Sequence, residues 1–492
     1  MEVTVSDAAP LTIISVSAEV APWSKVGGLA DVAAALPVAL ARRGHRVIGV
    51  APRYAPYDIA WDTRRTARFG LFGAEHEVRC FHARIDGVDR VFIGHPALSR
   101  GGIYGDEHGV YGDNDLRFAL LSRAAIEAVA LLGLSLPDDG ADTIVLAHDW
   151  HAALATVYLA ARYRHHGRLV RARSLLAIHN LAHQGVFSRD RFAGLDLEEH
   201  WWPTLDMGGD VNFLKAGIMA ADRLVTVSPT YAAEIRRPEH GWGLDGLLRM
   251  RAPVLDGIRN GLDTEAWNPR TDPYLPAHYD LDDLSGKAAC KAALQRELSL
   301  AEDPTVPLVV FIGRLDAQKG VDLLLSAVPW LRREGAQLVV LGTGDPGLEQ
   351  RLREVGDDRI RPIIDFSSAL AHRLTAAADV QVVPSRFEPC GLTQLQAMRY
   401  GAVPVVAATG GLVDTVQPYD PIADQGTGWH FRAGDADDLV RALGDALYTF
   451  RQWPEAFRGL VRRGMARDWS WAEPAAAWEA RMRDALAVPP WA

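Results

Sequence analysis

Lysine is rare in this chain, and two of its lysines stand close to glycines in segments that could bind an anion. The sequence contains 5 lysines against 47 arginines. A coding bias can exchange lysine for arginine at tolerant surface positions. It does not explain which lysines remain, because a compact ammonium and a planar guanidinium differ in a tight site. The two lysines of interest are Lys25 and Lys319.

Lys25 precedes a pair of glycines between an expected strand, Leu11–Ser17, and an expected helix, Ala30–Arg43. With no side chain at Gly27 and Gly28, backbone N–H groups could approach a phosphate closely, and the helix N-terminus would attract it. Glycine pairs are also common in plain turns, so these residues alone leave a phosphate site and a structural turn equally open. The order differs from a Walker motif, since the lysine comes first.

A second basic loop, Gly313–Gly320, follows an expected strand and opens an expected helix. Arg314 and Lys319 are five residues apart in this loop, which would suit two oxygens of a pyrophosphate. The alternative is a helix-start loop with solvated charges, but the combination of strand, basic pair and glycine favours the anion site. A nucleotide could also approach the backbone after a further strand, at Gly342 and Gly344.

A carboxylate stands in the turn that follows the expected strand Val380–Val383. Glu388 could hydrogen-bond sugar hydroxyls there, or stabilise positive charge on a sugar ring. Its alternative role is to cap the helix that follows. Cys390 lies near the same helix start, where a thiol can be activated, but packing is the commoner role and we assign it no chemical step.

Two polar clusters end expected strands in the first half of the chain, His148–His151 and His179-Asn180. Ligands bind beyond the carboxyl ends of parallel strands, so these clusters are candidates for a binding site. Several histidines together also suggest a metal. No two of them are four residues apart on one helix face, however, so the sequence predicts no metal site.

Expected strands and helices alternate in both halves of the chain, which predicts two doubly wound α/β domains in tandem. We place an N-terminal Rossmann-like domain at residues 1–255 and a second one at 256–470, with the last helical stretch, 471–492, returning to the first. Arg68–Ala83 and Val88–His95 are expected to be antiparallel excursions. Two such domains facing each other would form an interdomain cleft.

The composition argues against several classes of function. A net charge of −10 argues against general nucleic-acid binding. The apolar runs are only strand-sized, so we expect no membrane span, and the first ten residues lack the pattern of a signal peptide. Three widely separated cysteines in no metal-type spacing indicate a reducing compartment, so we expect a cytoplasmic protein without a disulfide framework.

Taken in chain order, these segments resemble the bacterial glycogen synthase and plant starch synthase family, whose fold is GT-B, with two Rossmann-like domains around a cleft. The resemblance runs over nearly the whole chain, and every lysine falls in a stretch that looks like a family segment. The matching segments are Lys25–Asp31 (KVGGLAD), His148–His151 (HDWH), His179–Ala182 (HNLA), Asn212–Gly217 (NFLKAG), Val227–Tyr231 (VSPTY), Asn260–Asp263 (NGLD), Gly313–Gly320 (GRLDAQKG), Ser385–Gln394 (SRFEPCGLTQ) and Thr409–Thr415 (TGGLVDT).

The resemblance implies transfer of glucose from ADP-glucose to the non-reducing end of an α-1,4-glucan such as glycogen or a maltodextrin, with retention of configuration. It implies no metal or other cofactor, because basic residues supply the electrostatic stabilisation. Lys25, Arg314 and Lys319 would hold the diphosphate. Glu388 would be the key acid near the transferred glucose, and His179 would lie beside its anomeric carbon. Further substrate-binding residues would be Gly27, Gly28, Asp31, Tyr111, Asp149, Asn180, Asn260, Gly342, Gly344, Phe366, Cys390, Gly391, Leu392 and Thr393.

Two positions depart from related GT-B transferases. Gln396 stands eight residues after Glu388, where many of them carry a second glutamate; synthase-type members lack it too, which supports the narrower assignment. Phe366 stands where some bacterial synthases carry a tyrosine near the adenine, so stacking would survive without the hydroxyl. UDP-glucose or another acceptor therefore stays open, as does an inactive glucan-binding homologue, although the intact basic residues argue against the latter.

Overall fold

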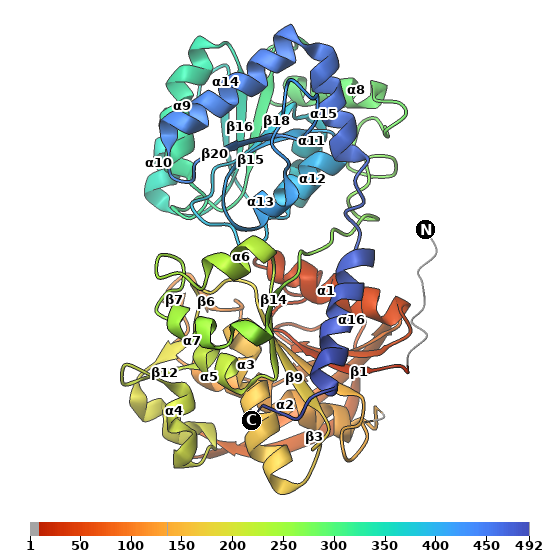
Figure 1. The fold of residues 1–492 in the computed structure, drawn as a ribbon, viewed down its shortest axis with the longest axis vertical. Coiled ribbons are helices and arrows are strands. Elements are labelled where there is room, and N and C mark those ends of the chain that lie inside the picture. Colours follow the sequence, from red (N-terminus) through yellow and green to blue (C-terminus); the bar gives the residue numbers. More distant parts are fainter. Residues whose placement is uncertain (1–8, 135, 492) are drawn as a thin grey trace. The chain divides into compact units, whose positions relative to one another are not determined.

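The computed structural model describes residues 9–134 and 136–491, which divide into two α/β units (Figure 1). Unit 1 comprises the described residues of Met1–Val227, Ala232–Gly261 and Trp471–Ala492. Unit 2 comprises Ser228–Tyr231 and Leu262–Ser470. The division at Gly261 lies six residues beyond the boundary that the sequence suggested.

Unit 1 is built on a nine-stranded sheet in the order β14-β13-β9-β8-β1-β2-β5-β4-β3. Strand β1 lies in its middle and pairs in parallel with both β2 and β8, so the direction of winding reverses between β1 and β8. The strands are β1 (Thr12–Val16), β2 (Arg46–Pro52), β3 (Trp61–Leu71), β4 (Ala74–Ile85), β5 (Val88–Gly94), β8 (Thr143–His148), β9 (Arg173–Ile178), β13 (Arg223–Thr226) and β14 (Leu255–Gly257).

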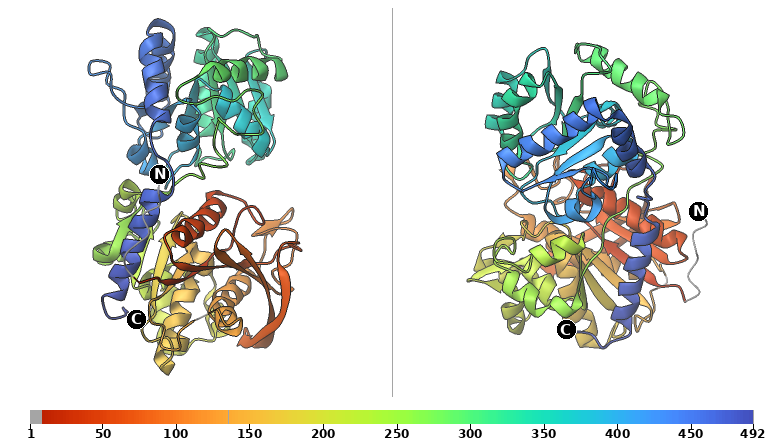
Figure 2. Two further views of the ribbon diagram at one scale, coloured as in Figure 1. Left: turned by 90° about the vertical axis from the view of Figure 1, so that its right-hand side faces the viewer. Right: turned by 45° about the horizontal axis from the view of Figure 1, so that its top comes forward.

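Helices cover both faces of this sheet, and two small sheets extend its loops (Figure 2). The helices are α1 (Gly28–Arg42), α2 (Asn114–Leu131), α3 (Asp149–Tyr158), α4 (Trp202–Leu205), α5 (Phe213–Ala220), α6 (Pro229–Glu234), α7 (Asp245–Met250) and α16 (Ala472–Leu486). The small sheets are β6 (Gly105–Asp106) with β7 (Gly109–Val110), and β10 (Val186–Phe187) with β11 (Asp206–Met207) and β12 (Asp210–Asn212). The C-terminal helix α16 packs against α1 and β9, and its Trp478 is only 1% exposed in the core of unit 1.

Helix α1 contains a proline, and a buried arginine compensates for it. Pro37 has no N–H, so the carbonyl of Ala33, four residues earlier, loses its helical partner. Arg90 of β5 donates to the carbonyl oxygens of Ala33 and Ala34 at 3.1 and 2.8 Å. The helix that follows the Lys25 loop is therefore fixed to the sheet by side-chain hydrogen bonds as well as by apolar packing.

Unit 2 has a six-stranded parallel sheet in the order β17-β16-β15-β18-β19-β20, with its winding reversal between β15 and β18. The strands are β15 (Leu308–Ile312), β16 (Gln337–Gly342), β17 (Ile360–Ile364), β18 (Val380–Val383), β19 (Val403–Ala407) and β20 (Trp429–Phe431). The helices are α8 (Ser285–Glu297), α9 (Val321–Arg333), α10 (Pro346–Glu354), α11 (Ser368–Ala377), α12 (Thr393–Arg399), α13 (Gly410–Thr415), α14 (Ala436–Gln452) and α15 (Pro454–Met465). Helices α9 and α14 pack together on one face and α8 and α11 on the other, so the unit is doubly wound (Figure 1).

The expectation for Val88–His95 was wrong in part. Strands β3 and β4 form an antiparallel hairpin, and β5 is antiparallel to β4. On its other side, however, β5 pairs in parallel with β2, so it belongs to the parallel sheet. Buried Asp89 and Arg90 interrupt the apolar run that normally marks such a strand, which explains the error.

Two of the five lysines, Lys287 and Lys291, stabilise the fold of unit 2. The Lys287 ammonium donates to the carbonyl oxygens of Ala376, Ala378 and Tyr400 at 2.9, 2.8 and 3.1 Å. Lys291 forms a buried ion pair with Asp379 at 2.7 Å. Lys287 and Lys291 therefore stabilise unit 2 from α8.

Candidate functional site

The site residues expected in the first half gather at the winding reversal of unit 1. The Lys25 loop follows β1, His148–His151 follows β8, and His179 follows β9. Strands β1, β8 and β9 are neighbours and parallel, so their carboxyl ends place these segments side by side. Ligands bind at such reversal points in open α/β sheets, because the loops diverge there and leave a crevice.

The Lys25 loop is organised by an internal carboxylate. The backbone N–H groups of Val26 and Gly27 both donate to Oε2 of Glu19, at 2.7 and 3.0 Å. We had expected the glycine turn to offer its N–H groups to a phosphate; two of them already have a partner here. The Lys25 ammonium contacts Asp31 at 2.7 Å, with both side chains about two-fifths exposed. A Cβ at Gly27 would have nothing within 4 Å, so the turn is open to an approaching molecule.

His179 is linked to the interior of unit 1 through a second histidine. Its Nε2 lies 2.9 Å from Nδ1 of His148, whose Nε2 lies 3.0 Å from Oγ of Ser15. Burial lowers the pKa of His179 to about 4, and it lowers the pKa of His148 well below its usual range. Both rings are therefore neutral at pH 7, and the His148–Ser15 contact fixes the orientation of the His179 ring.

Asp149 holds the backbone on which His179 and Asn180 stand. Its Oδ1 accepts from the N–H groups of His179 and Asn180 at 2.7 and 3.4 Å. Burial is the main reason that the pKa of Asp149 rises to about 7. Its φ is 55°, a left-handed conformation that costs a non-glycine residue about 1 kcal/mol. Such strain is typical of residues whose position matters for function.

Tyr111 and Asn260 are placed less closely. The Tyr111 hydroxyl accepts from the N–H of Gly102 at 3.1 Å, and Arg117 lies 4.7 Å from the centre of the ring. The side-chain contacts that the structure describes for Tyr111 lie in the segment 100–117, so they do not join it to the histidines. Asn260 is 7% exposed, and its Oδ1 has no hydrogen-bond partner among the described residues.

In unit 2 the two expected loops meet at the winding reversal. Lys319 follows β15 and Glu388 follows β18, and Nζ of Lys319 lies 2.6 Å from Oε2 of Glu388. The Ser385 hydroxyl donates to the same oxygen at 2.9 Å. Gly320 has a φ of 70°, and a Cβ there would lie 1.9 Å from the carbonyl oxygen of Pro384, so only glycine fits where the loops touch. The acid and the base are thus fixed by backbone packing.

Arg314 is the exposed member of this site. Its side chain is half-exposed and contacts Gln318 at 3.0 Å and Asp316 at 3.3 Å. Asp316 in turn accepts from the backbone N–H of Lys319 at 2.8 Å, at the start of α9. The loop therefore carries one half-exposed guanidinium and one ammonium fixed by Glu388, and two cations in one loop suit a polyanion.

Other residues expected to bind substrate surround the same strand ends. Gly342 and Gly344 are glycines for a structural reason, because Cβ atoms at these positions would lie 1.9 and 2.4 Å from carbonyl oxygens of the loop after β15. Phe366, after β17, is 72% exposed, as a ring free to stack would be. The remaining four stand between Glu388 and the first turn of α12, and they are Cys390, Gly391, Leu392 and Thr393.

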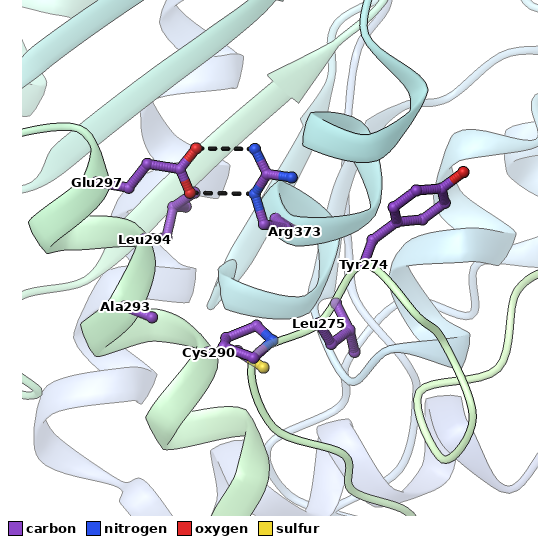
Figure 3. A pocket seen from close by; sticks show the side chains of 8 residues that line it. Tyr274, Leu275, Cys290, Ala293, Leu294, Glu297 and Arg373 are labelled. Atoms are coloured by element: carbon purple, nitrogen blue, oxygen red, sulfur yellow. Dashed lines mark hydrogen bonds and ion pairs between the residues drawn. The ribbon is translucent and has the colours of Figure 1, made fainter.

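A cavity of about 200 Å³ elsewhere in unit 2 contains none of the expected site residues (Figure 3). Tyr274, Leu294 and Cys290 are among its lining residues, and Glu297 and Arg373 form a two-fold ion pair at 3.0 and 2.8 Å beside it. Its walls come from α8, from α11 and from the segment that precedes α8, and none of these carries an expected site residue. We therefore place the candidate site at the strand ends.

The described residues contain no cluster of three or more histidine, cysteine or acidic side chains that could hold a metal ion. No helix in the described part of the chain is long and apolar enough to cross a membrane.

Sequence reasoning missed Glu19, Tyr104 and Ser385 as parts of the site. Glu19 lies three residues after the end of β1 and six residues before Lys25, a spacing that could have drawn attention to it. Ser385 stands three residues before Glu388 and was visible in the same segment. Tyr104 gave no signal, because it meets Glu19 only through the fold; its hydroxyl donates to Oε1 of Glu19.

Comparison with known proteins covers both units. Residues 12–250 match the family described as "Starch synthase catalytic domain", and residues 306–448 match "Glycosyl transferases group 1". Soluble starch synthase 1 of Oryza sativa subsp. japonica is 46% identical over 494 residues, spanning 95% of this chain and 77% of the relative. Starch synthase 1 of Arabidopsis thaliana is 44% identical over 507 residues, spanning 97% and 78%.

Solved structures agree with these relatives. The catalytic domain of starch synthase IV from Arabidopsis thaliana, bound to ADP and acarbose, matches with a TM-score of 0.90 and 33% identity, covering 98% of this chain and all of that one. Sucrose-phosphate synthase from Thermosynechococcus elongatus, at a TM-score of 0.60 and 19% identity, shares the fold alone. The two Rossmann-like units are those of the GT-B fold. With close to half of its residues identical to starch synthases over nearly its whole length, the chain belongs to the starch synthase family of glycosyltransferases.

Proposed function

We propose that the chain is an ADP-glucose:α-1,4-glucan glucosyltransferase that adds glucose, with retention of configuration, to the non-reducing end of glycogen or a maltodextrin. The observation that carries this is the Lys319–Glu388 contact at 2.6 Å, at the winding reversal of unit 2, in a chain of this family. The starch synthase IV structure is bound to ADP and acarbose, a nucleotide and a sugar, which supports both halves of the proposal.

In this proposal Arg314 and Lys319 neutralise the diphosphate as it leaves. Charge that develops on the leaving oxygens is stabilised most by donors already in position. Lys319 is held in place by Glu388, which contacts its ammonium, and by Asp316, which accepts its backbone N–H. Lys25 in unit 1, beside the open Gly27-Gly28 turn, is the third cation assigned to the donor.

We assign Glu388 and His179 to binding of the transferred sugar. Both side-chain bonds that the structure describes for Glu388 use Oε2, which leaves Oε1 for a hydroxyl of the transferred glucose. His179, neutral at pH 7, can accept or donate a hydrogen bond beside the anomeric carbon without adding charge. Asp149 positions the backbone of His179 and of Asn180 in the same turn, by accepting both N–H groups.

The test is incorporation of labelled glucose into glycogen from ADP-glucose and, separately, from UDP-glucose. We expect label from ADP-glucose to be incorporated into glycogen. An exo-acting enzyme specific for α-1,4 linkages at non-reducing ends should then release that label. No incorporation from either donor would leave an inactive glucan-binding homologue. Incorporation from UDP-glucose alone would contradict the donor assignment, for which Phe366 is the departure in this chain.

We also propose that the enzyme acts in the cytoplasm. Cys80, Cys290 and Cys390 form no disulfide with one another, as expected in a reducing compartment. Cell fractionation followed by detection of the protein would test this.

A further inference from the structure

Glu19 is a carboxylate that the interior of unit 1 holds at the start of the Lys25 loop. It is 3% exposed and lies three residues beyond the end of β1. Its Oε2 accepts the N–H groups of Val26 and Gly27 at 2.7 and 3.0 Å, and its Oε1 accepts the hydroxyl of Tyr104. Both oxygens are thus engaged, and both contacts of Oε2 go to the segment between Lys25 and Gly28.

Burying a carboxylate costs free energy, which other interactions must offset. A buried carboxylate is disfavoured unless hydrogen bonds satisfy it, and the described residues place no lysine or arginine in contact with Glu19. Burial indeed raises the pKa of Glu19, with the neighbouring Asp31 carboxylate acting in the same direction. An apolar residue would fill the same space at lower cost, so a hydrogen-bonding side chain is kept at this position for the bonds that it makes.

Tyr104 connects Glu19 to the segment that follows β8. The ring of Tyr104 stacks on His151, with centroids 4.7 Å apart and planes 27° apart. His151 stands two residues after Asp149, which holds the backbone of His179 and Asn180. A continuous set of contacts therefore runs from the Lys25 loop through Glu19, Tyr104 and His151 to the His179 turn.

We propose that Glu19 is a positioning residue, which fixes the Lys25 loop through the N–H groups of Val26 and Gly27 and aligns it, through Tyr104, with the Asp149–His151 segment. This inference rests on the proposed function, because it assigns Glu19 a role in binding and turning over the sugar nucleotide. Glu19 acts through Lys25 and the glycine turn, since its own oxygens already have partners.

The experiment compares Glu19→Ala and Glu19→Gln with a control pair in the same unit. Tyr163 donates to Glu127 at 2.7 Å, the same kind of bond far along the chain from the site residues, so Glu127→Ala is the matched control. Rates are measured with ADP-glucose and glycogen, each varied in turn, together with the unfolding midpoint of every variant. A misplaced binding loop can lower kcat/KM for ADP-glucose about 10²-fold, which is the loss that we expect in Glu19→Ala.

Glutamine keeps an oxygen for the two N–H groups and an amide for the Tyr104 oxygen, so Glu19→Gln should recover most of the lost kcat/KM. The KM for glycogen should stay within about threefold in both, because a fixed loop acts on the donor. Glu127→Ala should lower the unfolding midpoint and leave kcat/KM unchanged. If Glu19→Ala behaves like this control, or if Glu19→Gln is as inactive as Glu19→Ala, the positioning role is overturned.

Should Glu19→Ala fail to fold, Tyr104→Phe carries the test, because it removes one hydroxyl and keeps the stacked ring. Loss of a hydrogen bond to a charged group predicts kcat/KM for ADP-glucose lower by about tenfold. An unchanged kcat/KM would overturn the proposal. A wild-type protein that transfers no glucose from any donor would instead refute the proposed function, so the two failures are distinguishable.

Discussion

Glu388 in unit 2 and Asp149 in unit 1 are both 6% exposed, and each stands at the winding reversal of its sheet. Their partners differ. Glu388 contacts the Lys319 ammonium at 2.6 Å, whereas Asp149 accepts only backbone N–H groups among the described residues. Burial raises the pKa of Asp149 to about 7, although the N–H groups of His179 and Asn180 act in the opposite direction. Unit 2 thus presents a buried ion pair, and unit 1 presents a carboxyl group that titrates near neutrality.

The cations of the two units differ as well. Lys25–Asp31 and Lys319–Glu388 have nearly the same separation, 2.7 and 2.6 Å. The side chains of the first pair are 42% and 39% exposed, and those of the second 23% and 8%. An exposed pair is worth at most about 1 kcal/mol, so Lys25 can leave Asp31 for a ligand at little cost. Lys319 is held where it is.

The largest effect is expected from breaking the buried pair. Glu388→Ala should lower turnover by about 10³-fold or more, because the acid that we assign to the transferred sugar is lost, while glycogen binding stays largely intact. Lys319→Met should lower kcat about 10²-fold. Initial rates with labelled ADP-glucose and co-sedimentation with glycogen measure both. Retained turnover in Glu388→Ala would refute its assigned role.

Lys291–Asp379 supplies the control, since it is a buried pair in the same unit with a separation of 2.7 Å. Both Lys291→Met and Lys319→Met leave a buried carboxylate without its cation, so each should lose about 3–5 kcal/mol of unfolding free energy in urea. Only Lys319→Met should lose turnover per folded molecule. Equal losses of turnover in both would mean that the pairs serve stability alone.

The next effect is a pH dependence that comes from unit 1. Asp149 must be ionised to accept the N–H groups of His179 and Asn180 most strongly, so kcat/KM should fall as pH drops below about 7. His179 cannot cause this fall, because its pKa is about 4. Asp149→Asn should be less active and show no such fall between pH 6 and 8. A variant that keeps the full pH profile would contradict the assignment.

Stability should change with pH in the opposite direction. The folded protein holds the Asp149 proton with a pKa of about 7, against an ordinary value of 3.8, so its contribution favours folding at low pH. That contribution should be lost as pH rises from about 4 to 7, and Asp149→Asn should remove this part of the pH dependence. Unfolding midpoints of the two proteins across that range measure it.

The sequence allowed the winding of both units to be predicted, because strands such as β8, β15 and β16 contain uninterrupted apolar runs. It did not allow the parallel role of β5 to be predicted, since Asp89 and Arg90 are buried against partners on other elements, His82 of β4 and Ala33 of α1. The segments of the site were predictable, but their internal partners were not. Glu19 and Tyr104 are 85 residues apart, and nothing in either segment indicates that they touch.

The smallest effect separates the two binding lysines by the room around them. A compact ammonium fits a tight site in which a planar guanidinium has no room. Lys319 lies between Glu388 and the start of α9 and is only 23% exposed, so Lys319→Arg should lose activity nearly as Lys319→Met does.

Lys25 is 42% exposed beside an open turn, so a longer side chain has space there. Lys25→Met should raise the KM for ADP-glucose about tenfold with little change in stability, because one exposed charge is lost. Lys25→Arg should stay within about threefold of the wild type, because the charge is kept. Michaelis constants and unfolding midpoints of the four variants test this; an inactive Lys25→Arg would show that the loop closes tightly around its lysine when the donor binds.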